Sequence, residues 1–216
     1  MAGNKATALG AALVSLLLVA GSAPAATPGW RLASEPRDAG EAAVREAVQG
    51  PSPIGALDAV ARRFPDTAAG GLARLAAALE LVDAGRPADA LVQLSHPDLE
   101  KIPLRDHALL AASRAQELLG KSAEAAQAAL AAASEPTSAV TCTALPRAAE
   151  LFARANRNDD ALAALERTAA ACPQAAPAAL VELGSQRLAR GERAAAAAAF
   201  DRLDREYPLA LEAKLA

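Results

Sequence analysis

Aromatic residues are almost absent from this 216-residue chain, which contains three Phe, one Tyr and one Trp. Methionine occurs once, whereas alanine occurs 64 times. Strands favour aromatic and β-branched residues, and alanine is the strongest helix former. The composition therefore excludes an all-β fold and predicts an all-α protein.

The chain also lacks an excess of basic charge. It has 22 basic and 25 acidic residues, a formal net charge of −3. A nucleic-acid-binding protein would show a basic stripe or patch that complements phosphates. We therefore expect no nucleic-acid partner.

Histidine is equally rare, and no catalytic motif occurs. His96 precedes a proline and His107 lies on an expected helix, with no third ligand at metal-binding spacing. A glycine-rich phosphate loop, the G-x-S-x-G elbow and the H-E-x-x-H zinc motif are all missing. We expect no catalytic residue, no metal site and no cofactor in this chain, and we interpret its carboxylates as solvated helix faces.

Long apolar runs are missing except near the N-terminus. Lys5 precedes an uncharged run over 6–20, and Ala23 and Ala25 supply the small residues that a signal peptidase reads. The run has about 15 residues, fewer than the roughly 20 that a membrane span needs. We predict a secretory signal peptide over 1–25; the alternative is an uncleaved anchor helix.

Residue 22 argues against a lipid anchor. Segment 18–22 resembles a bacterial lipobox, but Ser22 stands where the acylated cysteine would be. Because a thioether to lipid needs a thiol, we expect no lipid anchor. We expect a periplasmic or secreted protein with no transmembrane span after signal cleavage. Residues 26–37 are expected to form a linker.

Residues that end helices recur at a nearly constant interval. Gly50, Gly85, Gly120, Asn156 and Gly191 are separated by 35, 35, 36 and 35 residues. Glycine and asparagine commonly end helices in the left-handed conformation, so this interval is typical of stacked pairs of antiparallel helices. A small residue five positions later and a proline near the end of each unit recur as well: Gly55, Ala90, Ala125, Ala161 and Ala196, then Pro65, Pro97, Pro136, Pro173 and Pro208.

These markers predict ten helices in a repeat domain over 38–208. The first helices of the pairs are expected at 38–49, 67–84, 104–119, 143–155 and 176–190. The second helices are expected at 53–64, 87–95, 122–133, 159–171 and 192–207. Residues 209–216 look like the start of another helix, which is either a short capping helix or the point where the sequence stops inside a longer protein.

The repeating residues resemble the tetratricopeptide repeat, a helix-turn-helix of 34 residues. The unit over 177–210 is the most similar, through Leu180, Leu183, Gly184, Gly191, Ala196, Phe200 and Pro208. The unit over 142–175 matches at Leu145, Ala148, Ala149, Ala161, Leu165 and Pro173. The resemblance implies a right-handed α-solenoid of about five antiparallel helix pairs with a period of about 35 residues. Large apolar residues, among them Leu57, Leu75, Leu118, Phe152 and Leu203, are expected in its core.

In this repeat family the first helices line a concave face on which partners lie. Carried over to this sequence, the family's positions imply a groove for a peptide or protein surface. The alternative is that they are ordinary solvated helix positions. The candidate groove residues are Leu75, Leu79, Val82, His107, Leu110, Arg114, Glu117, Glu150, Arg154, Val181, Ser185 and Leu188.

The two cysteines flank one expected helix pair. Cys142 precedes the helix at 143–155, and Cys172 follows the helix at 159–171. An antiparallel hairpin places these positions side by side, within reach of the Cα separation of about 4.4–6.8 Å that a disulfide needs. Because an exported protein is oxidised, we predict a Cys142–Cys172 disulfide; the alternative is two unrelated free thiols.

A second resemblance concerns segments 96–99, 104–109 and 119–125, and the ending that runs from Phe200 to Tyr207 and Pro208. They are similar to the N-terminal superhelical region of soluble lytic murein transglycosylases. In that family a helical ring precedes a lysozyme-like domain that cleaves peptidoglycan. No Glu-Ser pair and no Gly-Leu-Met-Gln stretch occurs here, so any catalysis would require a further domain.

Three functions follow as hypotheses. The first is a non-catalytic repeat scaffold of the bacterial periplasm or cell envelope, with a protein or peptide partner expected from either the envelope machinery or the peptidoglycan machinery. The second is the N-terminal helical region of a lytic transglycosylase whose catalytic domain is absent from this chain. The third is a small envelope-assembly factor; most of these are lipidated, and Ser22 weighs against it.

Overall fold

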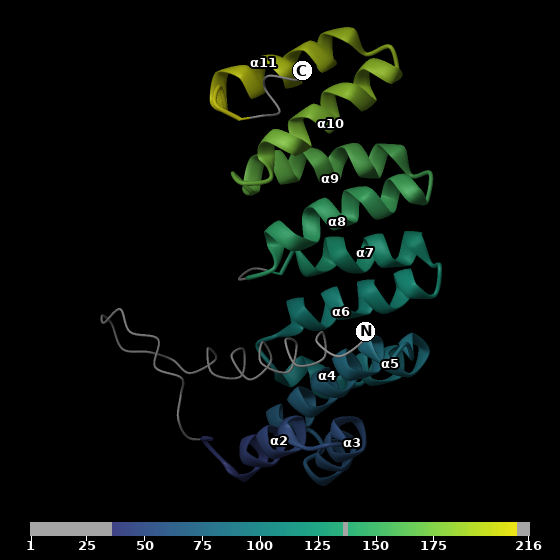
Figure 1. Cartoon of the computed structure of the whole chain (residues 1–216), viewed down its shortest axis with the longest axis vertical. Helices are drawn as coiled ribbons and strands as arrows, with labels where there is room; N and C mark the ends of the chain where they lie inside the picture. Colours follow the sequence, from purple (N-terminus) through teal and green to yellow (C-terminus); the bar gives the residue numbers. More distant parts are fainter. Residues whose placement is uncertain (1–35, 136–137, 211–216) are drawn as a thin grey trace, which may run out of the picture. The chain divides into compact units, whose positions relative to one another are not determined.

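The computed structural model describes residues 36–135 and 138–210, which form ten α-helices, one 3₁₀ helix and no strand (Figure 1). The all-α prediction is confirmed for this part of the chain. The predicted signal peptide, almost all of the predicted linker and residues 211–216 of the predicted terminal helix lie outside it. None of the described helices is both long and apolar enough to cross a membrane.

The chain divides into two compact units, Met1–Ala111 and Ala112–Ala216, and the division falls within α6. In the first unit the elements are α2 (Ala39–Gln49), α3 (Pro53–Arg63), α4 (Ala68–Asp83), α5 (Pro87–Leu94), η1 (Pro97–Lys101) and the beginning of α6 (Arg105–Leu118). The second unit contains the end of α6, then α7 (Ser122–Ala132), α8 (Thr141–Arg154), α9 (Asn158–Ala171), α10 (Ala176–Ala189) and α11 (Arg193–Glu206). All ten expected helices are present, with ends within two residues of their predicted positions.

Four turns between helices share one geometry. The residue that ends the helix has a positive φ in each, at Gly85 (+73°), Gly120 (+74°), Asn156 (+57°) and Gly191 (+78°). The following N–H donates to the carbonyl five residues earlier, as Arg86 does to Leu81 at 2.8 Å and Glu192 does to Arg187 at 2.9 Å. This is the Schellman ending, which glycine adopts without steric cost and asparagine tolerates.

One sequence prediction about helix ends is wrong. Gly50 ends α2 in an extended conformation with φ −73° and ψ 164°, because a residue that precedes a proline, here Pro51, is restricted to extended backbone. Pro97 follows the end of α5, as expected, and it also begins η1. Proline suits the first position of a helical turn, where its missing N–H would have no partner.

α4 is the centre of the first unit. Eleven of its 16 residues are buried, and it packs against α2, α3, α5 and η1. Two glycines allow this close approach, because a Cβ on Gly70 would collide with the carbonyl oxygen of Phe64 and one on Gly71 with that of Asp98. The helix is consequently covered on most of its surface.

In the second unit each helix from α7 to α11 packs against the next (Figure 1). Leu151, Phe152, Leu180 and Leu203 are among its largest fully buried side chains. Alanines fill much of the remaining core, and those with no exposed surface include Ala125, Ala126, Ala129, Ala148, Ala161 and Ala176. Leu118, expected in the core, is instead 56% exposed at the end of α6.

The predicted hairpin places the two cysteines together. Cys142 in the first turn of α8 and Cys172 just after α9 lie at disulfide-bonding distance, with Cα atoms 5.4 Å apart. Cys172 is buried, and Cys142 is exposed. The bond joins the two ends of the α8–α9 pair.

Candidate functional site

A trough of about 500 Å³ lies in the second unit between α8 and α10. This volume falls within the range of about 300–1,000 Å³ that is typical of ligand pockets. Three elements line it: α8, α9 and the segment that begins just before α10. The lining residues are Pro146, Ala149, Glu150, Ala153 and Arg154, then Leu165 and Thr168, then Ala175, Ala178, Ala179, Glu182 and Gln186.

Helical spacing brings these residues to one face of each helix. On α10, Ala178, Glu182 and Gln186 follow one another at intervals of four, so they lie on one side of the helix. The α8 residues follow the same spacing. Many of the lining positions are alanine, whose single methyl group leaves the space that a larger side chain would fill.

The floor of the trough is apolar. Leu165 and Thr168 of α9 are 7% and 1% exposed. The hydroxyl of Thr168 donates a hydrogen bond to the carbonyl of Ala164 at 2.8 Å. Since this hydroxyl is satisfied within its own helix, the floor favours small apolar groups.

A network of ion pairs borders the α8 side. Arg154 contacts Glu117 at 2.6 Å and Glu150 at 3.0 Å. The hydrogen bond to Glu117 raises the pKa of the Arg154 guanidinium. Glu117 also pairs with Arg147, whose Nε donates to the hydroxyl of Ser113 at 3.3 Å. The guanidinium of Arg154 is thus already engaged by two carboxylates.

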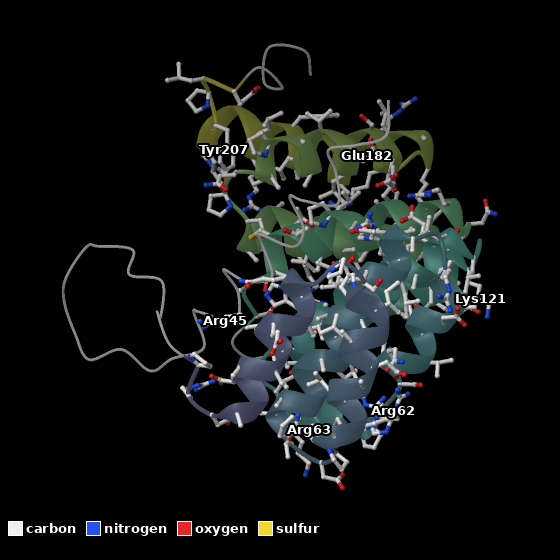
Figure 2. All side chains as sticks on the ribbon, turned by 60° about the horizontal axis from the view of Figure 1, so that its bottom comes forward. Arg45, Arg62, Arg63, Lys121, Glu182 and Tyr207 are labelled. Atoms are coloured by element: carbon white, nitrogen blue, oxygen red, sulfur yellow. A yellow bond between two sulfur atoms is a disulfide. The ribbon has the colours of Figure 1, made fainter. Side chains whose placement is uncertain are left out.

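Glu182 on α10, labelled in Figure 2, has a different environment. Its side chain is exposed, and its Oε1 accepts a hydrogen bond from Gln186 Nε2 at 2.7 Å. Within 36–135 and 138–210, no Lys, Arg or His forms an ion pair with it. Glu182 is therefore an acidic group at the trough without a counter-charge from the described part of the chain.

The candidate groove residues of the second unit divide into two groups. Glu150 and Arg154 line the trough, and Glu117 contacts it through Arg154. Val181 is half-buried against the core, whereas Ser185 is exposed and Leu188 is 54% exposed; none of these three lines the trough. Arg114 is exposed on α6.

On α10 the residues that line the trough, Glu182 and Gln186, are offset by one position from the predicted groove residues Val181 and Ser185. Leu180, Leu183 and Gly184 are buried and fix which side of the helix faces the core. Successive residues differ by about 100° around a helix, so Glu182 faces the trough and Val181 packs at the edge of the core. A pattern of small and polar residues at 175, 178, 182 and 186 was the available signal in the sequence.

The candidate groove residues of the first unit are largely not surface residues. Leu75 and Val82 are only 1% and 3% exposed, which contradicts their prediction as partner contacts, because α2, α3, α5 and η1 cover α4. Leu79 is half-buried against the same core. His107 and Leu110 are half-buried on α6.

Segment 96–99 has a structural role that the sequence did not reveal. Asp98 has no exposed surface, and it accepts hydrogen bonds from the Asp66 N–H at 3.0 Å and from Arg74 Nε at 2.9 Å. Burial alone would raise the pKa of Asp98, but these bonds and the charges of His96 and Arg74 outweigh it and hold the pKa below its ordinary value. Asp98 thereby fixes η1 to α4 and to the turn before it.

The described residues contain no group of three or more His, Cys, Asp or Glu side chains placed to hold a metal ion. Comparison of the chain with protein-family models, with curated proteins and with solved structures gives no match in any of the three.

Proposed function

We propose that this chain is a non-catalytic, tetratricopeptide-like scaffold, exported to the periplasm or secreted, that binds a segment of a partner protein in the trough between α8 and α10. The observation that carries the proposal is the trough itself. Its floor is apolar, its border is polar, and its two walls are the first helices of two consecutive pairs. This is the side of the helix pairs on which the resemblance places partners.

The arrangement of the helices supports this assignment. α8 and α9 are antiparallel neighbours, as are α9 and α10, so α8 and α10 run in the same direction with α9 between them (Figure 1). An extended or helical segment can lie along such a channel and contact both walls. The polar groups at the border would then fix its orientation.

A phage-displayed peptide library panned on the folded full-length chain tests the proposal. Peptides enriched on the wild type are expected to lose at least about tenfold in affinity on Ala178→Trp, because an indole on this lining residue fills the trough. Ala163→Trp is the matched control, since Ala163 is an exposed alanine of α9 that does not line the trough. The proposal fails if no peptide is enriched, or if both variants bind enriched peptides as the wild type does.

A further inference from the structure

The geometry points to a cationic segment as the occupant of the trough: a Lys or Arg side chain bound by Glu182, next to small apolar side chains. This inference rests on the proposed function and specifies the chemistry of its partner. It follows from the charges at the trough, from the surroundings of Glu182 and from the distribution of alanine.

The charged groups that line the trough do not balance. They are Glu150, Arg154 and Glu182, two carboxylates and one guanidinium. Arg154 is held by Glu117 as well as by Glu150, and its contact with Glu117 is the closer. An acidic ligand would have to compete with both carboxylates for Arg154, whereas a cation finds an unneutralised carboxylate at Glu182.

The two arginines that follow Glu182 in the chain are paired with other carboxylates. Arg187 of α10 pairs with Glu166 of α9, and Arg190, just after the end of α10, pairs with Asp159 of α9 at 2.6 Å. Neither reaches Glu182, whose i+4 neighbour is the neutral Gln186. The Gln186 amide orients the carboxylate and leaves further acceptor capacity for an ammonium or guanidinium group.

The apolar part of the preference comes from the residues next to Glu182. Ala178 lies one turn earlier on α10, about 6 Å along the helix axis, and Ala149 and Ala179 also line the trough. A lysine or arginine side chain bound at Glu182 therefore leaves the neighbouring residues of the ligand over a surface of methyl groups. Methyl-sized side chains fit there, and large aromatic ones require more room.

The test uses acetylated, amidated hexapeptide pools in which one position is fixed as Lys, Arg, Gln, Glu or norleucine. The pools are equilibrated with the immobilised full-length chain, and retained peptides are quantified by mass spectrometry. Lys and Arg pools are expected to be retained about fivefold more than Gln pools, the scale of one solvent-exposed charge pair. The preference should fall at 0.5 M salt, where screening is strong.

Glu182→Gln is expected to abolish this preference while it leaves retention of the norleucine pools unchanged. Glu124→Gln is the matched control, because Glu124 is an exposed carboxylate of α7 outside the trough. Circular dichroism of both variants checks that the helices are intact.

The outcomes separate the two proposals. A Lys and Arg preference that Glu182→Gln removes and Glu124→Gln preserves supports the inference. The inference is overturned if retention does not depend on peptide charge, or if Glu182→Gln still prefers Lys and Arg pools. If Ala178→Trp abolishes retention in either of these cases, the proposed function stands. Absence of retention for every pool overturns both.

Discussion

The two units use similar helix pairs but treat the first helix of the pair in opposite ways. In the first unit, Gly70 and Gly71 allow α4 to press against the Phe64 carbonyl and η1, and the helix is covered. In the second unit, alanines on α8 and α10 leave a trough open to solvent. The same sequence pattern therefore gives a closed or an open face, depending on what packs over the first helix.

The units also differ in what joins their helices. A buried carboxylate, Asp98, connects η1 to Arg74 and to the Asp66 N–H in the first unit. The second unit has the Cys142–Cys172 pair at the ends of α8 and α9. Each connection can be broken separately, which allows the comparison to be tested.

The largest effect is expected from Asp98→Ala. Removal of one partner of a buried ion pair leaves Arg74 without its carboxylate, and such losses cost about 3–5 kcal/mol. Hydrogen exchange read by mass spectrometry should show faster exchange in α3, α4 and η1. The comparison fails if α8–α10 respond as strongly as α4 does.

Replacement of both cysteines by serine should act on the second unit. Loss of a cross-link that closes a loop of this length costs about 2–4 kcal/mol of unfolding free energy. Urea denaturation of the oxidised protein, the reduced protein and the double variant measures the effect. The reduced protein should match the double variant; two alkylatable thiols in the untreated protein would contradict the predicted bond.

Gly184→Ala tests close packing within the second unit. A Cβ at Gly184 would lie 2.5 Å and 2.6 Å from two carbons of the Phe200 ring. Overpacking of this kind costs about 1–3 kcal/mol, and Phe200→Leu should recover part of it in the double variant. Ser185→Ala, at the exposed neighbouring position, should leave the denaturation midpoint unchanged.

Acid should weaken the first unit through Asp98. Its pKa is lowered in the folded state, so its stabilising contribution is present above the unfolded value of about 3.9 and is lost as the pH falls below it. Asp98→Asn should remove this acid-dependent part of the unfolding free energy. Denaturation curves between pH 6 and pH 3, a range that spans the reference value of about 3.9, provide the test. An unchanged dependence of the unfolding free energy on pH in the variant would contradict the prediction.

Most of the helix ends could be predicted from the sequence because they depend on local backbone chemistry. Gly85, Gly120, Asn156 and Gly191 each have the positive φ that their residue types suggest. The approach of the two cysteines follows from the hairpin alone. These features need no knowledge of how distant side chains pack.

The rest depends on packing that a repeat pattern does not encode. Asp98 looks like an ordinary surface carboxylate in the sequence, and its role appears only when Arg74 and Asp66 are brought beside it. The register of α10 likewise depends on how Gly184 meets Phe200. Of the family positions carried over to this chain, Glu150 and Arg154 line the trough, and Glu182, which also lines it, was not among them.

Photo-crosslinking tests the central claim most directly. Benzoylphenylalanine is placed at Ala178, in the trough, or at Ala163, outside it, and the full-length chain is irradiated with a peptide enriched by panning. The account predicts a crosslinked peptide from position 178 and none from position 163. Equal crosslinking from both positions, or crosslinking from position 163 alone, would contradict it.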